Sequence, residues 1–509
     1  MGINLSARQT IKYNMSGILS KKKGATAVKI IRNFSFLTLS QAGEKVINFL
    51  LIVILARFLG VEEYGVYALA VSFVGMFGNL FDGGLNFLIT REIASSGKNE
   101  AVFFRQALSL KIIIGAIVFA GLSIAAISMQ YDARVVYSII LFATATLLVS
   151  FSNAFRAVFV GRERMEFDGG MAVLYRFLAL AGVFFLLLAG MSFPYLMLPY
   201  IISALIVLIL SYYFQARMFP AIRSSEYLNI KKVELFKQAM PFAIGAVMSE
   251  VYFNVDSVML SKLSDIKTVG NYNAAYRLVF AGLLLANGLS LAAYPYFAKA
   301  WKEDKYNVYK TFNLIFKLLL IISLPVSFVV AFFANNVTVF VFGSKFYESG
   351  HILQILIWTL IPLYLYHITG RTLEAIGEQR FVAKTMVVSV VGNIILNTIL
   401  IPSFGAKGAA IATLISTSFI LLAHLLFISK KLGFPQILDT IYKIILPFLG
   451  CAAALVIADK YWTWQVAAIF SFLVYIFLLY LLKGVTVNEF DVLRGRERQG
   501  SEVRVKTGE

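Results

Sequence analysis

Apolar residues in this chain come in long runs that are separated by short polar segments. A helix rises about 1.5 Å per residue, so about 20 apolar residues cross a bilayer core of about 30 Å. Most runs are apolar on every side, unlike amphipathic soluble helices, and they do not alternate as barrel strands do. The pattern predicts an all-α polytopic membrane protein with about 14 transmembrane helices. The predicted spans cover residues 36–59, 64–89, 107–129, 135–160, 171–190, 195–214, 241–263, 273–298, 312–334, 352–376, 381–401, 408–429, 437–458 and 462–482.

Composition supports a membrane protein. Hydrophobic residues make up 59% of the chain and the mean hydropathy is +0.79, against about 45–50% apolar residues in soluble domains. The single cysteine, Cys451, lies inside a predicted span and excludes an intrachain disulfide. Residues 1–33 are basic and lack the apolar core of a cleavable signal peptide. The first span therefore serves as the insertion signal.

The formal net charge of +19 is distributed unevenly between the two predicted sides of the membrane. When the 46 Lys and Arg residues are assigned to alternate sides, 37 fall on the side of the N-terminus, eight on the other side, and Lys45 within a span. Cytoplasmic loops carry such an excess. We therefore expect both termini to be cytoplasmic in a protein of the cytoplasmic (plasma) membrane. The charge reflects topology and attraction to anionic lipids rather than nucleic-acid binding.

A short internal repeat divides the chain. Gly65, Tyr67 and Ala70 recur 205 residues later as Gly270, Tyr272 and Ala275, each set eight residues after a cation. So short a match can arise by chance, but both copies fall between the first and second helices of a six-span unit. Six spans is an even number, so the two units share one orientation, as in transporters with parallel repeats and a substrate path between halves.

The repeat and the polar segments predict six regions along the chain. They are a basic cytoplasmic N-terminal segment (1–33), an N-lobe (34–220), a cytoplasmic linker (221–240), a C-lobe (241–432), two further helices (433–483) and a cytoplasmic tail (484–509).

No motif in the chain predicts an enzyme. The three histidines are scattered, and the zinc-protease, P-loop and serine-hydrolase signatures are absent from the sequence. We expect a transporter with no catalytic residue, no metal site and no cofactor.

Polar residues inside two equivalent spans carry the functional signal. A charge at the centre of a bilayer costs at least about 2.5–3.5 kcal/mol, so it normally faces a cavity or a partner. Helical spacing suggests one stripe on each span and a hydrated cleft between the lobes. Alternatively, Lys45 pairs with Glu250 or Asp256 and ties the lobes together. The two sets are Ser40, Gln41, Glu44, Lys45 and Asn48 in the first span and Ser249, Glu250, Asn254, Asp256 and Ser257 in the seventh.

Other charges permit two interpretations. Arg57, Lys262 and Arg277 cluster at the predicted outer helix ends, where they either snorkel to the interface or recognise phosphate. Asp82 beside Gly83 and Gly84 marks either a local turn or a ligand. Arg371 and Glu374 share a helix face and are expected to pair.

Several short segments resemble one transporter family. They are Ile54–Gly60 leading to Tyr64–Tyr67, Gly84-Leu85 leading to Thr90–Ala94, Asp256–Leu260 leading to Gly270–Leu278, and Gly405–Thr413. Because these segments occur together and in this order, the chain resembles the polysaccharide-biosynthesis export proteins. These are the O-antigen (Wzx-like) and teichoic-acid type flippases of the multidrug/oligosaccharidyl-lipid/polysaccharide (MOP) exporter superfamily. The resemblance implies two six-helix lobes in a V, two C-terminal helices, and alternating access for a lipid-linked oligosaccharide.

The lipid II flippases of this superfamily are similar in part. Lys45 stands where they carry a cavity arginine, and Arg277 resembles a cavity cation of their eighth helix. Leu51 replaces a second cation and Glu44 adds an anion, so lipid II itself is the less expected cargo.

These observations predict a flippase for a polyprenyl phosphate or diphosphate that bears a glycan. Its expected partners are the lipid-linked oligosaccharide, membrane lipids and the polymerase or glycosyltransferase machinery. The alternatives are a MATE-like drug or metabolite cation antiporter and a membrane-embedded glycosyltransferase, which would need a larger polar loop. The expected site residues are Lys45 and Arg277 for phosphate, Gln41, Asn48, Asn254 and Arg57 for the rest of the cargo, and Glu44, Glu250 and Asp256 for gating or for H⁺ or Na⁺ coupling.

Overall fold

The computed structural model describes residues 38–95, 100–193, 195–220, 232–433 and 437–484, together with 33 and 36. Within these ranges all regular elements are helices, which confirms the all-α prediction. A first helix covers 38–59. Almost all of the predicted N-terminal segment, the first part of the linker and nearly all of the tail lie outside the described residues.

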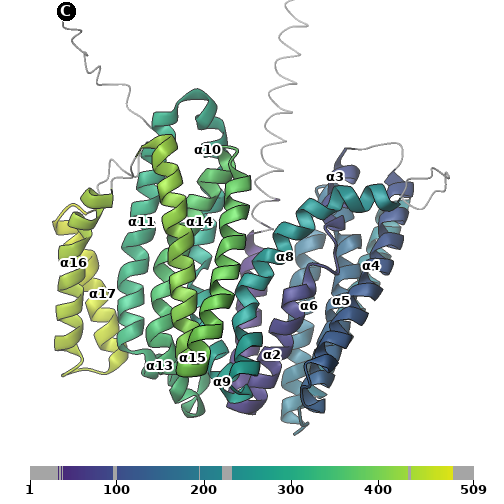
Figure 1. Ribbon diagram of the computed structural model, residues 1–509, viewed down its shortest axis with the longest axis horizontal. Coiled ribbons are helices and arrows are strands. Elements are labelled where there is room, and N and C mark those ends of the chain that lie inside the picture. The colour runs from purple at the N-terminus through teal and green to yellow at the C-terminus, as the bar shows by residue number, and fades with distance from the viewer. Residues whose placement is uncertain are drawn as a thin grey trace, which may run out of the picture. The chain divides into compact units, whose positions relative to one another are not determined.

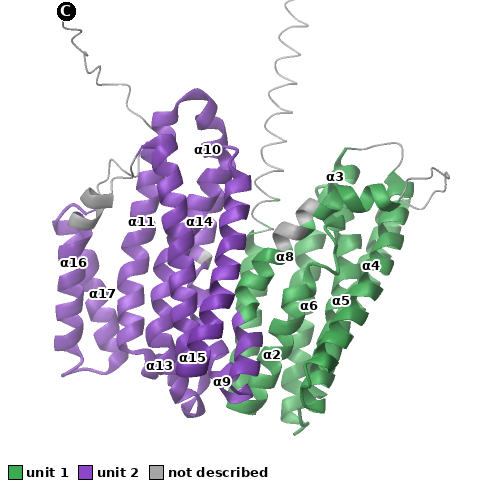
Figure 2. Cartoon of the chain, in the orientation of Figure 1, with its two compact units in different colours: residues 1–255 green, residues 256–509 purple. Residues whose placement is uncertain are grey.

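The chain forms two compact units, residues 1–255 and 256–509 (Figure 2). In the first unit, α5 packs against α2, α3, α4, α6 and α7. This central position explains why α5 carries a long series of small and apolar buried residues. Besides the first helix, the elements are α2 (Val61–Gly78), α3 (Leu85–Ala94), α4 (Glu100–Ser128), α5 (Ala133–Gly161), α6 (Met165–Leu188), the 3₁₀ turn η1 (Tyr195–Met197), α7 (Leu198–Met218) and most of α8 (Lys232–Leu263).

In the second unit, α14 occupies the comparable central place and packs on α10, α11 and α15 (Figure 1). The helices α16 and α17 form a hairpin on α11, where the Tyr475 hydroxyl donates to the Ile321 carbonyl at 2.9 Å. The elements are α9 (Ile266–Gly282), α10 (Leu284–Glu303), α11 (Lys305–Phe332), α12 (Ala334–Phe342), η3 (Ser344–Phe346), α13 (Tyr347–Leu356), η4 (Ile357–Thr359), α14 (Leu360–Ala375), α15 (Gln379–Leu432), α16 (Ile437–Ala458) and α17 (Trp464–Leu481).

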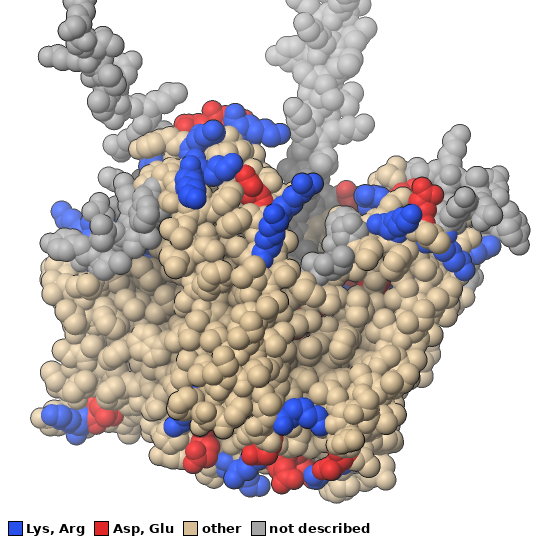
Figure 3. Space-filling model, viewed as in Figure 1, with Lys and Arg blue, Asp and Glu red and all other residues tan. Residues whose placement is uncertain are grey.

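The helices are those of a multi-pass membrane protein. Each predicted span is mostly helical, and eight described helices are long and apolar enough to cross a membrane, or nine with the bent pair α9–α10. The element α15 joins two predicted spans at Gly405, whose backbone is not helical (φ 53°). The count of fourteen stays a prediction. In the face shown in Figure 3, charged side chains gather near the helix ends of each unit and leave an uncharged band between.

The predicted linker ends earlier than expected. The helix α8 begins at Lys232, so residues 232–240 are helical. Leu235 and Ala239 pack into a buried cluster with residues of α3, α4 and α5, which stabilises this first part of the helix. The boundary between the two compact units lies further on, inside α8 between Val255 and Asp256.

The internal repeat has structural support. The helix α2 begins at Val61 and α9 at Ile266, which is the same 205-residue offset, and each is followed by a break and a second helix. Tyr67 and Tyr272, the repeated tyrosines, are both buried. Their hydroxyls serve different partners, because Tyr67 bonds Tyr200 at 3.0 Å whereas Tyr272 donates to Asp256 at 2.6 Å.

The break between α2 and α3 is a turn, as one interpretation of Asp82 predicted. Gly83 and Gly84 adopt positive φ angles of 58° and 75°. Asp82 accepts a hydrogen bond from the Asn86 backbone N–H at 3.3 Å at the start of α3. The carboxylate therefore stabilises a helix start inside a predicted span.

We expect Gly84→Ala to destabilise the first unit by at least about 2 kcal/mol. A Cβ at Gly84 would lie 2.4 Å from the Ala239 carbonyl oxygen of α8, and the left-handed backbone alone costs about 1–2 kcal/mol for alanine. The melting temperature of the purified protein in detergent checks this. Gly121→Ala is the matched control, because nothing lies within 4 Å of its added carbon. Equal melting temperatures for the two variants would contradict the expectation.

Candidate functional site

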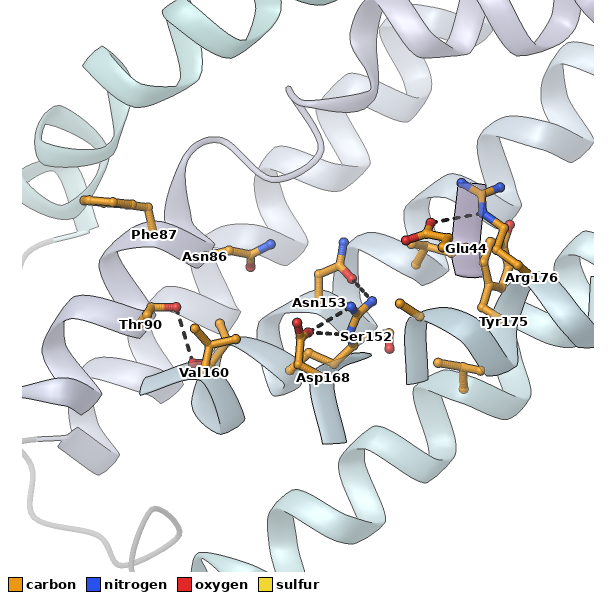
Figure 4. Close-up of a pocket in the computed structure, with 15 residues that line it drawn as sticks. Glu44, Asn86, Phe87, Thr90, Ser152, Asn153, Val160, Asp168, Tyr175 and Arg176 are labelled. Carbon is orange, nitrogen blue, oxygen red and sulfur yellow. Dashed lines mark hydrogen bonds and ion pairs between the residues drawn. The ribbon is translucent and has the colours of Figure 1, made fainter. Parts of the chain in front are cut away.

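A cavity of about 670 Å³ opens inside the first unit, with walls from the first helix and from α3, α5, α6 and α7 (Figure 4). Charged groups are unusual in an apolar bundle and indicate function. Four charged residues line this cavity, together with two asparagines, and Figure 4 shows the charged residues in two separate groups. These six residues are Glu44, Asn86, Asn153, Arg156, Asp168 and Arg176.

The first group joins α5 to α6. The Nε and Nη2 atoms of Arg156 each lie 2.8 Å from Oδ1 of Asp168. Nη1 of the same arginine donates to Oδ1 of Asn153 at 2.8 Å. Both charged side chains are largely buried, with exposed fractions of 16% and 17%. The guanidinium is therefore held in a fixed orientation at the cavity wall.

The second group joins α6 to the first helix. Nε of Arg176 donates to Oε1 of Glu44 at 3.1 Å, and the guanidinium lies 5.3 Å from the centre of the Tyr175 ring. Here one hydrogen bond holds the arginine, and 29% of its side chain is exposed. This cation is held less tightly than Arg156.

A buried lysine orients the asparagine of α3. Lys111 of α4 is fully buried, and its ammonium donates to Asp82 at 2.6 Å and to Oδ1 of Asn86 at 3.0 Å. The amide oxygen of Asn86 thus accepts a hydrogen bond from Lys111. Its Nδ2 group is therefore the end that can donate to a ligand in the cavity.

A second polar cluster lies inside the second unit, around Asp256. Oδ2 of Asp256 accepts hydrogen bonds from Tyr272 at 2.6 Å and Thr413 at 2.7 Å, and Oδ1 accepts one from Asn397 at 2.6 Å. Asn397 Nδ2 also donates to Oδ1 of Asn393 at 2.9 Å. Within the described part of the chain, Asp256 forms no ion pair and Oδ1 of Asn397 is buried without a hydrogen-bond partner. Among the described residues, the hydrogen-bond partners of Asp256 are neutral side chains that also carry oxygen atoms.

The predicted stripe on the first helix divides in the structure. Glu44 faces α6 and the cavity, and Ser40 faces Gly169 of α6. Lys45 and Gln41 are exposed on the surface of the first unit, and Asn48 is half-buried. The single-stripe prediction is wrong here, because neighbouring residues point about 100° apart.

The predicted stripe on the seventh span is also wrong as a single face. Nδ2 of Asn254 donates to Oε2 of Glu250 at 3.2 Å, and the amide lies against Gly75 of α2. Asp256, two residues further along α8, belongs to the second unit, where it is 2% exposed and bonds Thr413 of α15. Lys45 and Glu250, both in the first unit, form no ion pair in its described residues.

The remaining predicted residues are not among those that line the cavity. Arg57 is exposed near the end of the first helix, and Arg277 is half-buried on α9. The predicted pair on α14 is confirmed, since Arg371 lies 2.7 Å from Glu374.

Arg156, Asp168 and Arg176 were not among the predicted site residues. Both arginines lie within predicted spans, 135–160 and 171–190. The topology count assigned them to the adjoining loops, as it did Lys111. The rule that a charge inside a span faces a cavity or a partner, applied to every span, selects all three cations.

Comparisons with known proteins agree on the class. The family model described as polysaccharide biosynthesis protein matches residues 30–301, and the MatE model matches residues 241–399. Agl15 of Haloferax volcanii, a probable low-salt glycan biosynthesis flippase, is 26% identical over 403 residues, which cover 77% of this chain and 82% of that protein.

Solved structures share the fold. The lipid II flippase MurJ in an inward closed conformation matches with a TM-score of 0.72 at 18% identity, over 88% of this chain and 98% of that one. An inward-facing multidrug resistance MATE family transporter of the MOP superfamily matches with a TM-score of 0.62 at 16% identity, over 77% and 94%.

Proposed function

This chain belongs to the polysaccharide biosynthesis protein family, and from that membership we propose that it is a flippase for a lipid-linked oligosaccharide. It is a transporter, not an enzyme. The cargo is a polyprenyl phosphate or diphosphate that carries a glycan, and the protein moves it across the membrane by alternating access. The relative Agl15, named as a probable glycan biosynthesis flippase, supports the same activity.

The arginine-lined cavity of the first unit carries this proposal. Sugar and phosphate groups lose their water in hydrocarbon and need replacement partners. Guanidinium groups suit phosphate because they offer several N–H donors in one plane. Arg156 and Arg176 supply such groups, and Asn86 and Asn153 supply amides for hydroxyl groups. The polyprenyl tail stays in the lipid.

The residues that the sequence singled out keep a place in the proposal. Lys45 and Arg277 are further phosphate contacts, and Gln41, Asn48, Asn254 and Arg57 contact the rest of the cargo. Glu44 gates the cavity through its ion pair with Arg176. Glu250 orients the side chain of Asn254 by accepting a hydrogen bond from it. The exposure of Lys45 and Gln41 is compatible with contact to a cargo that enters from the membrane.

We propose Na⁺ as the coupling ion and the Asp256 cluster as its site. Hard cations take oxygen ligands, and Asp256, Asn393, Asn397 and Thr413 supply carboxylate, amide and hydroxyl oxygens. One monovalent cation balances the one buried carboxylate. A proton would also neutralise Asp256, but it would leave Oδ1 of Asn397 without a partner.

The proposal includes a location and partners. The protein lies in the cytoplasmic membrane with both termini in the cytoplasm, as the distribution of Lys and Arg favours. Glycosyltransferases that build the glycan on the inner leaflet supply its cargo, and a polymerase or transferase on the outer side consumes it.

Translocation in reconstituted vesicles tests the function. We expect the protein to expose a polyprenyl-diphosphate oligosaccharide to an impermeant sugar-modifying enzyme faster than protein-free vesicles do. Lys45→Ala and Arg277→Ala should each lower the rate about tenfold, because charge-assisted hydrogen bonds are worth about 1.5–3 kcal/mol. Lys460→Ala, at an exposed turn between α16 and α17, is the control. Unchanged rates for Lys45→Ala and Arg277→Ala would remove these residues from the site.

A cation antiporter of the MATE type is the second candidate. The MatE match over residues 241–399 favours it. The paired arginines of the first unit favour an anion instead. The same vesicles, loaded with a cationic dye, separate the two functions, because an antiporter would expel the dye when a Na⁺ or H⁺ gradient is applied.

A further inference from the structure

The charged groups of the cavity lie at two different depths of the first unit. Asp168, the partner of Arg156, and Arg176 are both on α6, eight residues apart. Eight residues span about 12 Å along a helix, or more than two turns. Figure 4 shows the two groups apart, with Asp168, Arg156 and Asn153 in one and Glu44 and Arg176 in the other. Each arginine is therefore held by its own carboxylate, in a group of its own along α6.

Each arginine already has an anion. Asp168 lies 2.8 Å from Arg156, and Glu44 lies 3.1 Å from Arg176. A buried arginine without a counter-ion is strongly destabilising, so these carboxylates keep the empty cavity neutral. A phosphate oxygen is the same kind of acceptor as a carboxylate oxygen and competes for the same N–H groups.

We propose that the cavity contains two anion sites that hold the phosphate of one cargo in succession, and that Asp168 and Glu44 are exchangeable placeholders. This inference rests on the proposed function. The Arg156 site lies near the α5–α6 turn, whose Arg162 and Arg164 belong to the predicted cytoplasmic side. It therefore captures the phosphate first. The Arg176 site lies deeper in α6 and receives the phosphate next.

The hydrogen bonds of the two arginines agree with this order of binding. Three donor atoms of Arg156 are engaged by Asp168 and Asn153, which gives a rigid and selective first site. Arg176 is held by one longer bond to Glu44. The first helix, which carries Glu44, is thus joined to α6 by a contact that an arriving phosphate displaces.

Two arginine variants test the order, with binding and translocation measured separately. Polyprenyl diphosphate is the probe for binding to the protein in detergent, and the polyprenyl-diphosphate oligosaccharide is the cargo in vesicles. We expect Arg156→Gln to weaken binding and raise the half-saturating cargo concentration about tenfold, with the maximal rate kept within about twofold. Arg176→Gln should leave binding within about threefold and lower the maximal rate at least about tenfold.

Asp168→Asn tests whether the Asp168 carboxylate occupies the place of the phosphate on Arg156. Removing the competing carboxylate should tighten binding of polyprenyl diphosphate several-fold, and weaker binding would contradict the exchange. Arg134→Gln is the control for loss of an arginine, because Arg134 lies in an exposed pair with Glu62 in the same unit. Melting temperatures of all variants separate misfolding from loss of function.

The outcomes distinguish this inference from the proposed function. Equal loss of binding in Arg156→Gln and Arg176→Gln, or loss in neither, overturns the two-site order. If the unmodified protein binds polyprenyl diphosphate without translocating the oligosaccharide, the proposed function fails. The difference in binding between Arg156→Gln and Arg176→Gln still shows whether the cavity has one anion site or two. If the unmodified protein binds no polyprenyl diphosphate, both fail.

Discussion

Lys111→Met is expected to lower the free energy of unfolding by about 3 kcal/mol, the largest effect on stability among the substitutions considered. Lys111 is fully buried, and its ammonium is the counter-ion of Asp82 at 2.6 Å. Removing one partner of a buried ion pair costs about 3–5 kcal/mol, because the other charge stays desolvated. Asp82 keeps 24% of its side chain exposed, so the lower end of that range applies. Unfolding of the purified protein in mixed micelles measures the effect.

A second variant shows whether the loss comes from the unpaired charge. Asp82→Asn combined with Lys111→Met removes both charges, and we expect it to recover most of the lost stability. Arg134→Met breaks the exposed pair with Glu62 and should cost at most about 1 kcal/mol. A double variant as unstable as Lys111→Met alone would show that packing of the lysine stem matters, not the ion pair.

The sequence predicts the helices well because their determinants are local. Length and apolar composition place a helix at each predicted span. The 205-residue repeat also anticipates that α2 and α9 begin at equivalent positions. A turn at Gly84 was one of two interpretations of Asp82, and Gly405 lies between two predicted spans, but the sequence does not give the backbone geometry of either break. A hydropathy pattern contains no backbone angle, so such breaks need the packing around them.

The candidate site was predicted only in part. Glu44 was selected and lies in the cavity, and Asp256 was selected and lies in a buried oxygen-rich cluster. The assumed cause, one polar stripe per helix, was wrong, because rotation about the helix axis sends Lys45 and Asn254 in other directions. Arg156 and Arg176 line one cavity because α5, α6 and the first helix all contribute to its walls. The sequence alone does not show that residues 20 positions apart line the same cavity.

The two units carry complementary chemistry. In the first, arginines are paired with carboxylates in a cavity. In the second, a buried carboxylate is held by neutral donors and a neighbouring amide oxygen has no partner. Arginines that line a cavity suit an anionic cargo, and a buried carboxylate held by neutral donors suits a cation. The proposed anion site therefore lies in one unit and the proposed coupling site in the other.

Asp256→Asn is expected to abolish the stabilisation of the protein by Na⁺. A bound ligand stabilises the folded state by RT ln(1 + [L]/Kd), which is about 2.7 kcal/mol when the Na⁺ concentration is one hundred times Kd. The melting temperature of the unmodified protein should rise when choline is replaced by Na⁺. The variant keeps the shape of the side chain but offers no charge to the ion, so its melting temperature should be the same in both salts. Cargo translocation driven by a Na⁺ gradient should fall at least about tenfold in this variant.

The control for this substitution is Asp265→Asn in the same unit. Asp265 caps α9 by accepting a hydrogen bond from the Thr268 backbone N–H at 2.7 Å, and asparagine caps a helix equally well. Its response to Na⁺ should equal that of the unmodified protein. Tyr272→Phe removes one of the hydrogen bonds to Asp256 and leaves the carboxylate, so we expect an altered Na⁺ affinity rather than its loss. An Asp256→Asn protein that Na⁺ still stabilises would place the coupling ion elsewhere, and a response to pH in place of Na⁺ would identify the ion as a proton.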